Sequence, residues 1–490
     1  MSACSSSSDP EATPSQAPPP PDALLNDNTA DSGIAGSFAS NTVEGANLRS
    51  GQVWADFTGD GLQDLYLTTV SGPNLLYDNM GDGKFAGSTF AEDVSLIDAQ
   101  SGSASAPDYD NDGLADLFVL TDSGPRLFHS EGKNGFTETT DSVLSGDLSK
   151  TTAAAWADWN GDGYTDLAIG DSVGGPVLLR NDAGTKLIPT GSIESGLPGT
   201  ASGTINAVAF FDADGDFDND LYVVYASDTS KNALYRNDDG LWPNVAADAG
   251  ADLDGGALSV TVADIDNNAA ADLLIAGPKG LTLLSASADG NTFTNSTKTA
   301  GLEYPESLWD VVAVDINDDG LLDVYAAGIG DNLVFLGKST GSFDSPYSVT
   351  GNNESRGVAT ASVFGTGRAD FVIANVGSDN QTYKNATTSG ARLQVSVTGS
   401  GPVATDAIGT RITITPSGSS DPNSTQTVFA GFGPATGTGN SLVQHVGLGS
   451  ATSVDIDVQW PDGTKASFTN VAVDVSWSLT YGGQPATASF

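Results

Sequence analysis

Short apolar segments alternate with Gly- and Asp-rich turns along most of the chain. After the acidic turns, apolar residues recur at every second position, as in Leu65/Leu67, Leu117/Val119, Leu167/Ile169, Leu221/Val223, Leu273/Ile275 and Phe371/Ile373. A period of two is typical of a strand with one buried face. Further along each unit comes another apolar run, then a glycine turn and an aromatic residue, as at Leu75–Tyr77 and Phe85. The pattern therefore predicts many short strands joined by tight turns.

The acidic turns are copies of one nine-residue motif, D-x-[DNT]-x-[DN]-G-x-x-D. Its first position falls at Asp56, Asp108, Asp158, Asp212, Asp264, Asp315 and, in an eroded copy, Ser362, so the steps are 47 to 54 residues. A steady period near 50 is typical of a propeller blade of four short strands. Seven such units fit a closed ring, which leaves no exposed sheet edge. The sequence predicts an all-β protein, a seven-bladed β-propeller followed by a small β-sandwich-like domain.

Each of the first six copies offers oxygen ligands at alternate positions, which is the arrangement that Ca²⁺ prefers. Side chains at positions 1, 3, 5 and 9 and the backbone carbonyl of position 7 are the expected ligands, and about six calcium ions are expected. The predicted ligands are Asp56, Thr58, Asp60, Leu62 and Asp64; Asp108, Asp110, Asp112, Leu114 and Asp116; Asp158, Asn160, Asp162, Tyr164 and Asp166; Asp212, Asp214, Asp216, Asp218 and Asp220; Asp264, Asp266, Asn268, Ala270 and Asp272; and Asp315, Asn317, Asp319, Leu321 and Asp323.

The copies differ in quality. Glycine at position 6 allows the left-handed backbone that folds the loop around an ion, but Phe217 and Ala269 replace it in the fourth and fifth copies. We expect strain of roughly 1 kcal/mol at each. Asn268 also removes a carboxylate, so the fifth site is expected to be the weakest, and the copy from Asp108 the best. The eroded copy from Ser362 to Asp370 is expected to fold without metal.

The charge balance narrows the choice of partners. The chain has 18 basic and 62 acidic residues, a formal net charge of −44, so nucleic-acid binding is not expected. Each divalent ion adds two charges, so six would leave −32, and the remaining acidity suits a saline habitat or further cations.

The N-terminus suggests a tether. Cys4, the only cysteine, follows small residues and precedes a Ser- and Pro-rich stretch through Pro21. This resembles the end of a bacterial lipoprotein signal, with lipid on Cys4 and a flexible tether over residues 1–28; the alternative is a plain disordered terminus. A single cysteine excludes an intramolecular disulfide, and no run of 18 apolar residues is present.

Catalytic chemistry has few candidates. The two histidines are His129, expected at a strand end, and His445, expected to pack or hydrogen-bond locally. Nucleotide-binding loops, nucleophile elbows and zinc spacings are missing from the sequence. The prediction is that the chain is not an enzyme. The alternative is a calcium-assisted polysaccharide lyase, which would need a Lys, Tyr or Arg base in a groove.

The acidic motifs and their spacing resemble those of the FG-GAP/VCBS repeat family, which forms the propellers of integrin α subunits and of many bacterial surface proteins. The resemblance covers residues from about 30 to 385. After Lys384 the composition becomes Gly-, Ser- and Thr-rich, and strands are expected at 393–397, 411–415, 427–430, 454–460 and 475–480. The segments Ile408–Ile414, Gly431–Gly433, His445–Gly449 and Trp460–Gly463 resemble the ASPIC/UnbV domain, which follows such a propeller in bacterial relatives of the cartilage acidic protein family. Val446 departs from the aromatic residue of many members.

These observations predict three parts: a tether over 1–28, a propeller over 29–388 and an ASPIC/UnbV-like domain over 389–490. The resemblance implies an extracellular or cell-surface scaffold for adhesion or assembly. Its partners would be calcium ions and a protein or glycan on a cell surface or matrix, including the chain itself, with membrane attachment only through a lipid on Cys4.

Overall fold

The computed structural model describes residues 24–36, 50–190, 203–238, 240–421, 424–431 and 441–490. Strands dominate these residues, and the helices are single turns: α1 (Thr29–Ser32), η2 (Gly132–Asn134), α2 (Thr140–Val143), α3 (Ala246–Ala249) and α4 (Thr297–Ala300). Within the described ranges, no helix is both long enough and apolar enough to cross a membrane. The predicted all-β fold class is confirmed.

Five separate antiparallel sheets of three or four strands follow one another in the described part of the propeller, each with its strands in chain order. They are β2 (Gln52–Ala55), β3 (Asp64–Leu67), β4 (Leu75–Asn79) and β5 (Phe85–Gly87); β6 (Ser101–Ser105), β7 (Leu117–Thr121), β8 (Gly124–Ser130) and β9 (Phe136–Glu138); β10 (Thr151–Ala157), β11 (Asp166–Asp171), β12 (Val177–Asn181) and β13 (Leu187–Pro189); β14 (Ile205–Phe211), β15 (Asp220–Tyr225) and β16 (Ala233–Tyr235); and β17 (Ser259–Ala263), β18 (Asp272–Gly277), β19 (Gly280–Ala286) and β20 (Phe293–Asn295).

The last two repeat units are joined in one six-stranded sheet. Its order is β1-β27-β26-β25-β22-β21, because the 13-residue β22 pairs with β21 along its first half and with β25 along its second. The strands are β21 (Leu308–Val314), β22 (Asp323–Phe335), β25 (Tyr347–Ala361), β26 (Asp370–Val376), β27 (Gln381–Asn385) and β1 (Leu25–Asp27), with the small pair β23 (Gly337–Ser339) and β24 (Ser342–Phe343) beside them. The repeat alone predicted two separate blades here.

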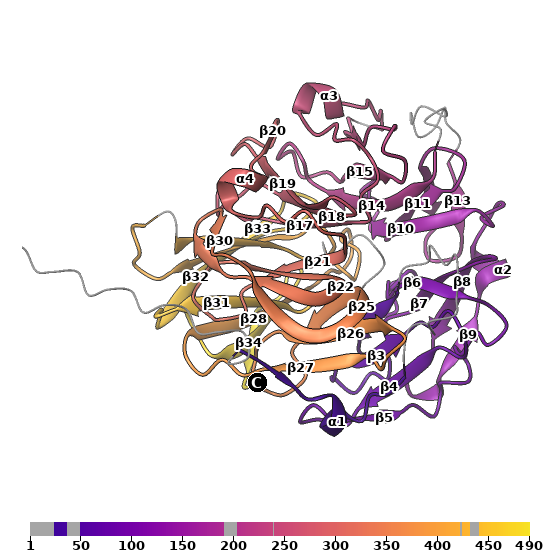
Figure 1. Ribbon diagram of the computed structural model, residues 1–490, viewed down its shortest axis with the longest axis horizontal. Coiled ribbons are helices and arrows are strands. Elements are labelled where there is room, and N and C mark those ends of the chain that lie inside the picture. Colours follow the sequence, from indigo (N-terminus) through magenta and orange to yellow (C-terminus); the bar gives the residue numbers. More distant parts are fainter. Residues whose placement is uncertain (1–23, 37–49, 191–202, 239, 422–423, 432–440) are drawn as a thin grey trace, which may run out of the picture.

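The two ends of the propeller chain meet. Strand β1 pairs with β27, from Leu25 opposite Asn385 to Asp27 opposite Tyr383, and Figure 1 shows indigo β1 lying along orange β27. Trp54 of the first sheet packs in one core cluster with Val372 of the last. The tether predicted over residues 1–28 therefore extends too far toward the C-terminus, because residues 25–27 form the edge strand that closes the ring. Residues 1–23, with Cys4, lie outside the described residues.

The C-terminal part consists of two four-stranded sheets with a core of their own. The sheet orders are β31-β28-β34-β35 and β30-β29-β32-β33, and Val395, Ile412, Trp460 and Trp477 are buried between them. The strands are β28 (Ala391–Thr398), β29 (Arg411–Pro416), β30 (Gln426–Phe429), β31 (Gln444–Gly449), β32 (Ser453–Gln459), β33 (Lys465–Ala472), β34 (Val475–Thr480) and β35 (Ala486–Ala488). We call residues 391–488 the C-terminal module. The five strands predicted in it are all present.

Candidate metal loops

The nine-residue motifs form the loops between the first two strands of each repeat, and we number them from the first loop (56–64) to the seventh (362–370). In five of the first six loops the position-1 aspartate closes the loop by accepting the backbone N–H groups of the residues at positions 5 and 6. In the second loop Asp108 accepts from Asp112 at 3.0 Å and from Gly113 at 2.9 Å. The fourth loop varies this pattern, since Asp212 accepts from Gly215 at position 4 and from Phe217 at position 6.

The position-5 side chain also accepts a backbone N–H group, that of the residue at position 7. Asp112 accepts the N–H of Leu114 at position 7 at 2.8 Å, and Asn268 accepts that of Ala270 at 2.7 Å. These bonds turn the predicted ligand positions toward one centre. In three of the loops, three predicted ligand residues each have a carboxylate oxygen within 4.8 Å of the corresponding oxygens of the other two. These sets are Asp108, Asp110 and Asp112; Asp212, Asp214 and Asp220; and Asp264, Asp266 and Asp272.

Position 6 has the left-handed backbone that the sequence predicted. The φ angles there are +90° at Gly113, +77° at Phe217 and +72° at Ala269, so the two side chains without a glycine do occupy a strained region. Position 4 is also left-handed, for example at Asn111 with φ +59° and at Asp318 with φ +59°. Sequence reasoning missed this second position, although its Gly, Asn and Asp residues are those that tolerate it.

The position-9 aspartates have a backbone role that the sequence did not show. Asp272 accepts the N–H of Ile265 at 2.8 Å on one oxygen and that of Ala286 at 2.7 Å on the other. Asp370 makes the same two bonds in the seventh loop, to Val363 at 3.0 Å and to Asn385 at 2.8 Å. The seventh loop lacks acidic residues at positions 1, 3 and 5, so the position-9 aspartate makes these two bonds even where no metal is expected.

Burial sets the protonation of these carboxyl groups. It raises the pKa of Asp64 to about 7, of Asp116 to about 9 and of Asp272 to about 8, against opposing backbone hydrogen bonds. Burial, and then the neighbouring Asp323, raises the pKa of Asp315 well above its usual range. A bound cation would favour the ionised forms that burial disfavours. The all-oxygen donor set, the left-handed turn and the converging carboxylates fit Ca²⁺.

Basic side chains lie beside the second, fourth and fifth loops. His129, at the end of β8 as expected, places Nδ1 3.2 Å from Asp116 Oδ1 and 3.3 Å from Asp110 Oδ2. In the fourth loop Arg236 Nε lies 3.0 Å from Asp214 Oδ2. Arg411 donates to the carbonyl of Ala269 in the fifth loop. The two loops without a position-6 glycine thus each have an arginine beside them.

The C-terminal module lies against the first three loops. Ser441 Oγ donates to Gln63 Oε1 in the first loop at 2.8 Å. The N–H of Asp108 in the second loop donates to Asp406 Oδ2 at 2.9 Å. In the third loop a β-carbon at Gly163 would lie 2.9 Å from the carbonyl oxygen of Gly401.

The module also lies against the remaining loops. A β-carbon at Gly409 would lie 3.1 Å from Asn219 Oδ1 in the fourth loop, and Arg411 reaches the fifth. In the sixth loop the carbonyl of Asp318 accepts the N–H of Gly449 at 2.9 Å. His445 Nδ1 lies 2.8 Å from the carbonyl oxygen of Gly367 in the seventh loop. The expectation of a local partner for His445 is therefore wrong, because its partners are in the propeller.

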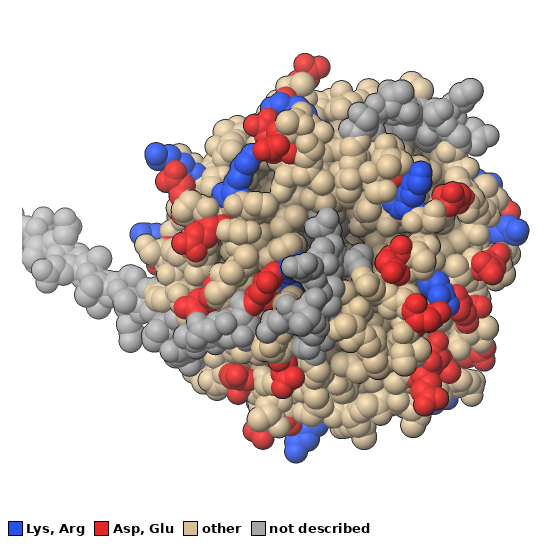
Figure 2. Space-filling model, turned by 45° about the vertical axis from the view of Figure 1, so that its right-hand side comes forward, with Lys and Arg blue, Asp and Glu red and all other residues tan. Residues whose placement is uncertain are grey.

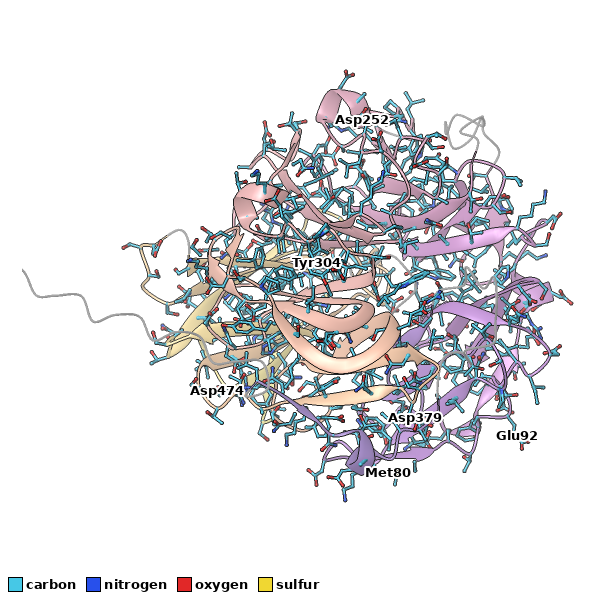
Figure 3. All side chains as sticks on the ribbon, viewed as in Figure 1. Met80, Glu92, Asp252, Tyr304, Asp379 and Asp474 are labelled. Atoms are coloured by element: carbon cyan, nitrogen blue, oxygen red, sulfur yellow. The ribbon has the colours of Figure 1, made fainter. Side chains whose placement is uncertain are left out.

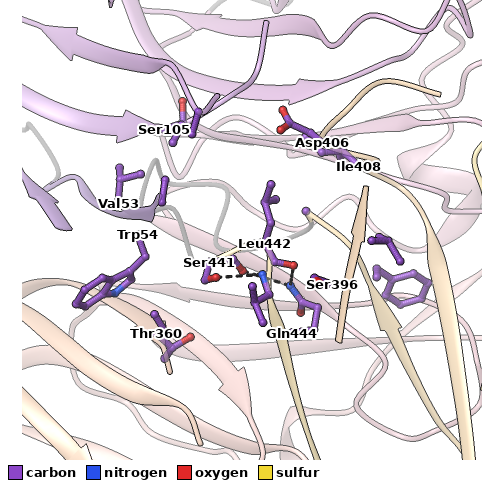
Figure 4. Close-up of a pocket in the computed structure, with 18 of the residues that line it drawn as sticks. Val53, Trp54, Ser105, Thr360, Ser396, Asp406, Ile408, Ser441, Leu442 and Gln444 are labelled. Carbon is purple, nitrogen blue, oxygen red and sulfur yellow. Dashed lines mark hydrogen bonds between the residues drawn. The ribbon is translucent and has the colours of Figure 1, made fainter. Parts of the chain in front are cut away.

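A cavity of about 430 Å³ lies between the module and the first strand of every repeat unit. Val53 and Thr360 line it from the propeller, and Asp406, Leu442 and Gln444 from the module (Figure 4). The first strands β2, β6, β10, β14, β17, β21 and β25 all contribute lining residues, so this cavity marks the propeller axis. The module closes the axis on the side of the loops.

Acidic side chains outnumber basic ones on the face shown in Figure 2. On the face in Figure 2, acidic side chains are spread over the surface with basic ones among them. Exposed apolar side chains are scattered, such as Met80 at the rim in Figure 3, which is 66% exposed, and Val173 on another blade. This face does not single out one partner site.

Comparisons with known proteins follow the same division of the chain. Residues 108–169 and 158–223 match the model of the FG-GAP-like repeat, and residues 384–486 match that of ASPIC and UnbV. The chain carries FG-GAP-like repeats and an ASPIC and UnbV domain. The C-terminal module is thus the ASPIC and UnbV domain, and the second to fourth loops lie within the matched FG-GAP-like repeats.

The chain is also similar to several solved structures. BBS1N, crystallised in complex with ARL6DN and soaked with lead, is 12% identical, with a TM-score of 0.47, over 74% of this chain and 96% of that one. YCF48 from Cyanidioschyzon merolae is 10% identical with a TM-score of 0.43 over 71% and 98%, and an Agrocybe aegerita lectin is 19% identical with 0.44 over 64% and 83%. These TM-scores are below 0.5, so nothing about function is drawn from them. No curated protein matches the chain.

Proposed function

We propose that this FG-GAP-repeat protein is a non-catalytic, calcium-binding extracellular scaffold used for adhesion or assembly. The observation that carries the proposal is the repetition of one ligand geometry: six loops in which a position-1 aspartate accepts inner backbone N–H groups, as Asp108 and Asp264 do. One such loop is a common acidic turn. Six in register, with buried carboxyl groups whose ionised forms a bound cation would stabilise, support cation binding.

Each ion would take side-chain oxygens from positions 1, 3, 5 and 9 and the carbonyl of position 7. Calcium would supply positive charge at the centre of each loop and thereby fix the turn between the first two strands of the repeat. The scaffold itself would bind its partner through surfaces away from the loops, because the ASPIC and UnbV domain covers them. Assembly through this covered surface would require exchange of the domain between chains.

Catalysis is not part of the proposal, and the two histidines and Arg236 each contact a propeller loop. His129 lies against two loop carboxylates, His445 against Gly367, and Arg236 against Asp214. An extracellular place, with lipid on Cys4 as the only membrane attachment, belongs to the proposal through the resemblance at the N-terminus. Cys4 lies outside the described residues.

The proposal is tested by counting calcium in the full chain. Elemental analysis after gel filtration in calcium-containing buffer should give about six ions per chain, and two or fewer would contradict it. Matched variants refine the count: Asp112→Ala in the second loop should remove one ion. Asp266→Ala at the fifth loop, which has fewer carboxylates and a strained Ala269, should change the measured affinity less.

A further inference from the structure

The contacts between the domain and the loops depend on the shape of the loops. In the sixth loop the domain approaches the backbone so closely that a β-carbon at Gly447 would overlap the Asp315 carboxylate, and one at Gly449 would lie 3.1 Å from the carbonyl oxygen of Asp319. Asp315 and Asp319 are two of the predicted ligands. The fit of the domain therefore depends on the position of the Asp315 side chain and of the Asp319 backbone.

A buried charge cluster joins the sixth loop, the seventh loop and the domain. Asp318 Oδ2 lies 2.7 Å from Arg368 Nε, and Asp318 Oδ1 lies 3.2 Å from His445 Nε2. The side chains of Asp318, Arg368 and His445 are 0%, 8% and 6% exposed. Arg368 belongs to the seventh loop, which lacks acidic residues at positions 1, 3 and 5. Only His445 of this cluster belongs to the domain, so separation of the domain would break the Asp318–His445 contact, whereas the Asp318–Arg368 pair lies within the propeller.

Like charges face each other at another point of the same interface. Asp406 of the domain is 6% exposed and accepts the backbone N–H of Asp108, a predicted ligand of the second loop. Burial, and to a smaller extent the nearby Asp108 carboxylate, raises the pKa of Asp406 to about 7. A cation in the second loop would offset the repulsion between these two carboxylates, whereas an empty loop would add to it.

We propose that the cations of the loops hold the ASPIC and UnbV domain closed over the axial cavity, with the sixth loop as the main control point. The proposal rests on the proposed calcium binding. When the loops lose their ions, their carboxylates repel, the turns open and the domain separates from the propeller. The occupant of the loop face is thus the chain's own C-terminal domain, and its docking is metal-dependent.

A buried cysteine reporter can measure this opening in the full chain. Ser441 is 3% exposed and contacts Gln63 across the interface, so Ser441→Cys in a Cys4→Ser background places a thiol at the edge of the cavity. We expect its labelling by a thiol reagent to be at least tenfold faster in chelator than in calcium. A second reporter, Ala276→Cys in β18, fully buried in the propeller, should stay protected if the propeller remains folded.

Two matched loop variants locate the control point. Asp319→Ala and Asp162→Ala each remove the position-5 carboxylate, from the sixth and third loops, and both positions are exposed. In calcium, Asp319→Ala should accelerate labelling at position 441 by several fold and Asp162→Ala should have a smaller effect. Equal effects would overturn the role given to the sixth loop.

The outcomes separate the two proposals. If elemental analysis shows that chelator removes calcium while labelling at position 441 stays slow, metal-dependent docking is wrong and calcium binding stands. Fast labelling of the Ala276→Cys reporter together with that of Ser441→Cys would also overturn it, because the propeller itself would have unfolded. If no calcium binds at all, the proposed function fails and this inference with it.

Discussion

At the scale of single residues, the aspartates of each motif have two different structural roles. Position 1 closes the loop and converges with positions 3 and 5, as Asp108 does with Asp110 and Asp112. Position 9 binds two backbone N–H groups, one inside the loop and one on the next strand, in Asp272 and in Asp370. Asp370 keeps this role in a loop without the other carboxylates, which separates folding from metal binding.

Asp370→Ala tests that separation. The change leaves the buried N–H groups of Val363 and Asn385 without their acceptor, and unsatisfied buried groups cost about 1–3 kcal/mol each. We expect a loss of about 3 kcal/mol in the free energy of unfolding, equal in calcium and in chelator. Asp112→Ala is the control, because it should lower the free energy of unfolding in calcium but not in chelator. Denaturant unfolding measures both; a loss for Asp370→Ala that vanished in chelator would contradict the structural role.

Residue patterns also show where the sequence was sufficient and where it was not. The positive φ of Phe217 and Ala269 followed from the missing glycines. The contact of Arg411 with Ala269 could not be foreseen, since the two residues are 142 positions apart. Position 9 was predicted only as a ligand. Its hydrogen bonds go to backbone N–H groups, which every residue except proline has, so the partner residues cannot be recognised in the sequence.

At the scale of elements, strands with alternating apolar residues were predicted and others were missed. β28, β29 and β34 were expected from their Val and Ile pattern. β33 was not, because its side chains are largely exposed at a sheet edge, and β31 was hidden in a Gly-rich motif. The continuous β22 was also missed, because the repeat suggested two strands separated by a turn.

The buried carboxyl groups of the loops should make the stability of the metal-free protein depend on pH. Burial raises the pKa of Asp64 to about 7 and those of Asp220 and Asp272 to about 8, above the usual value of 3.8 for an aspartate. The folded state therefore binds more protons than the unfolded state from about pH 4 to pH 8, and its stability falls as pH rises through that window.

In chelator, the midpoint of thermal unfolding should accordingly be higher at pH 5.5 than at pH 8. Calcium should reduce or reverse the difference, because the bound ion favours the ionised carboxylates. Circular dichroism at the two pH values, with and without calcium, measures this. A metal-free chain that melts higher at pH 8 would show that these carboxyl groups are not held in the buried, mutually repelling arrangement.

At the scale of the whole molecule, ring closure and domain docking bring together segments that the sequence keeps apart. β1 and β27 close the ring across more than 350 residues. The ASPIC and UnbV domain contacts loops from the first, through Gln63, to the seventh, through Gly367. Periodicity predicted the repeated unit and its domain boundary near Lys384, but it carried no information on which face of the propeller the domain covers.

The central claim is that six calcium ions stabilise the propeller through its loops, and thermal unfolding with and without calcium tests it most directly. Extracellular sites bind calcium with dissociation constants of about 10⁻⁴ to 10⁻³ M. At free calcium about tenfold above that, each site contributes about 1.4 kcal/mol and six contribute roughly 8 kcal/mol. At pH 7.5, chelation should lower the melting temperature by on the order of 15 °C. A melting curve that chelator does not change would show that the loops are acidic turns without bound calcium.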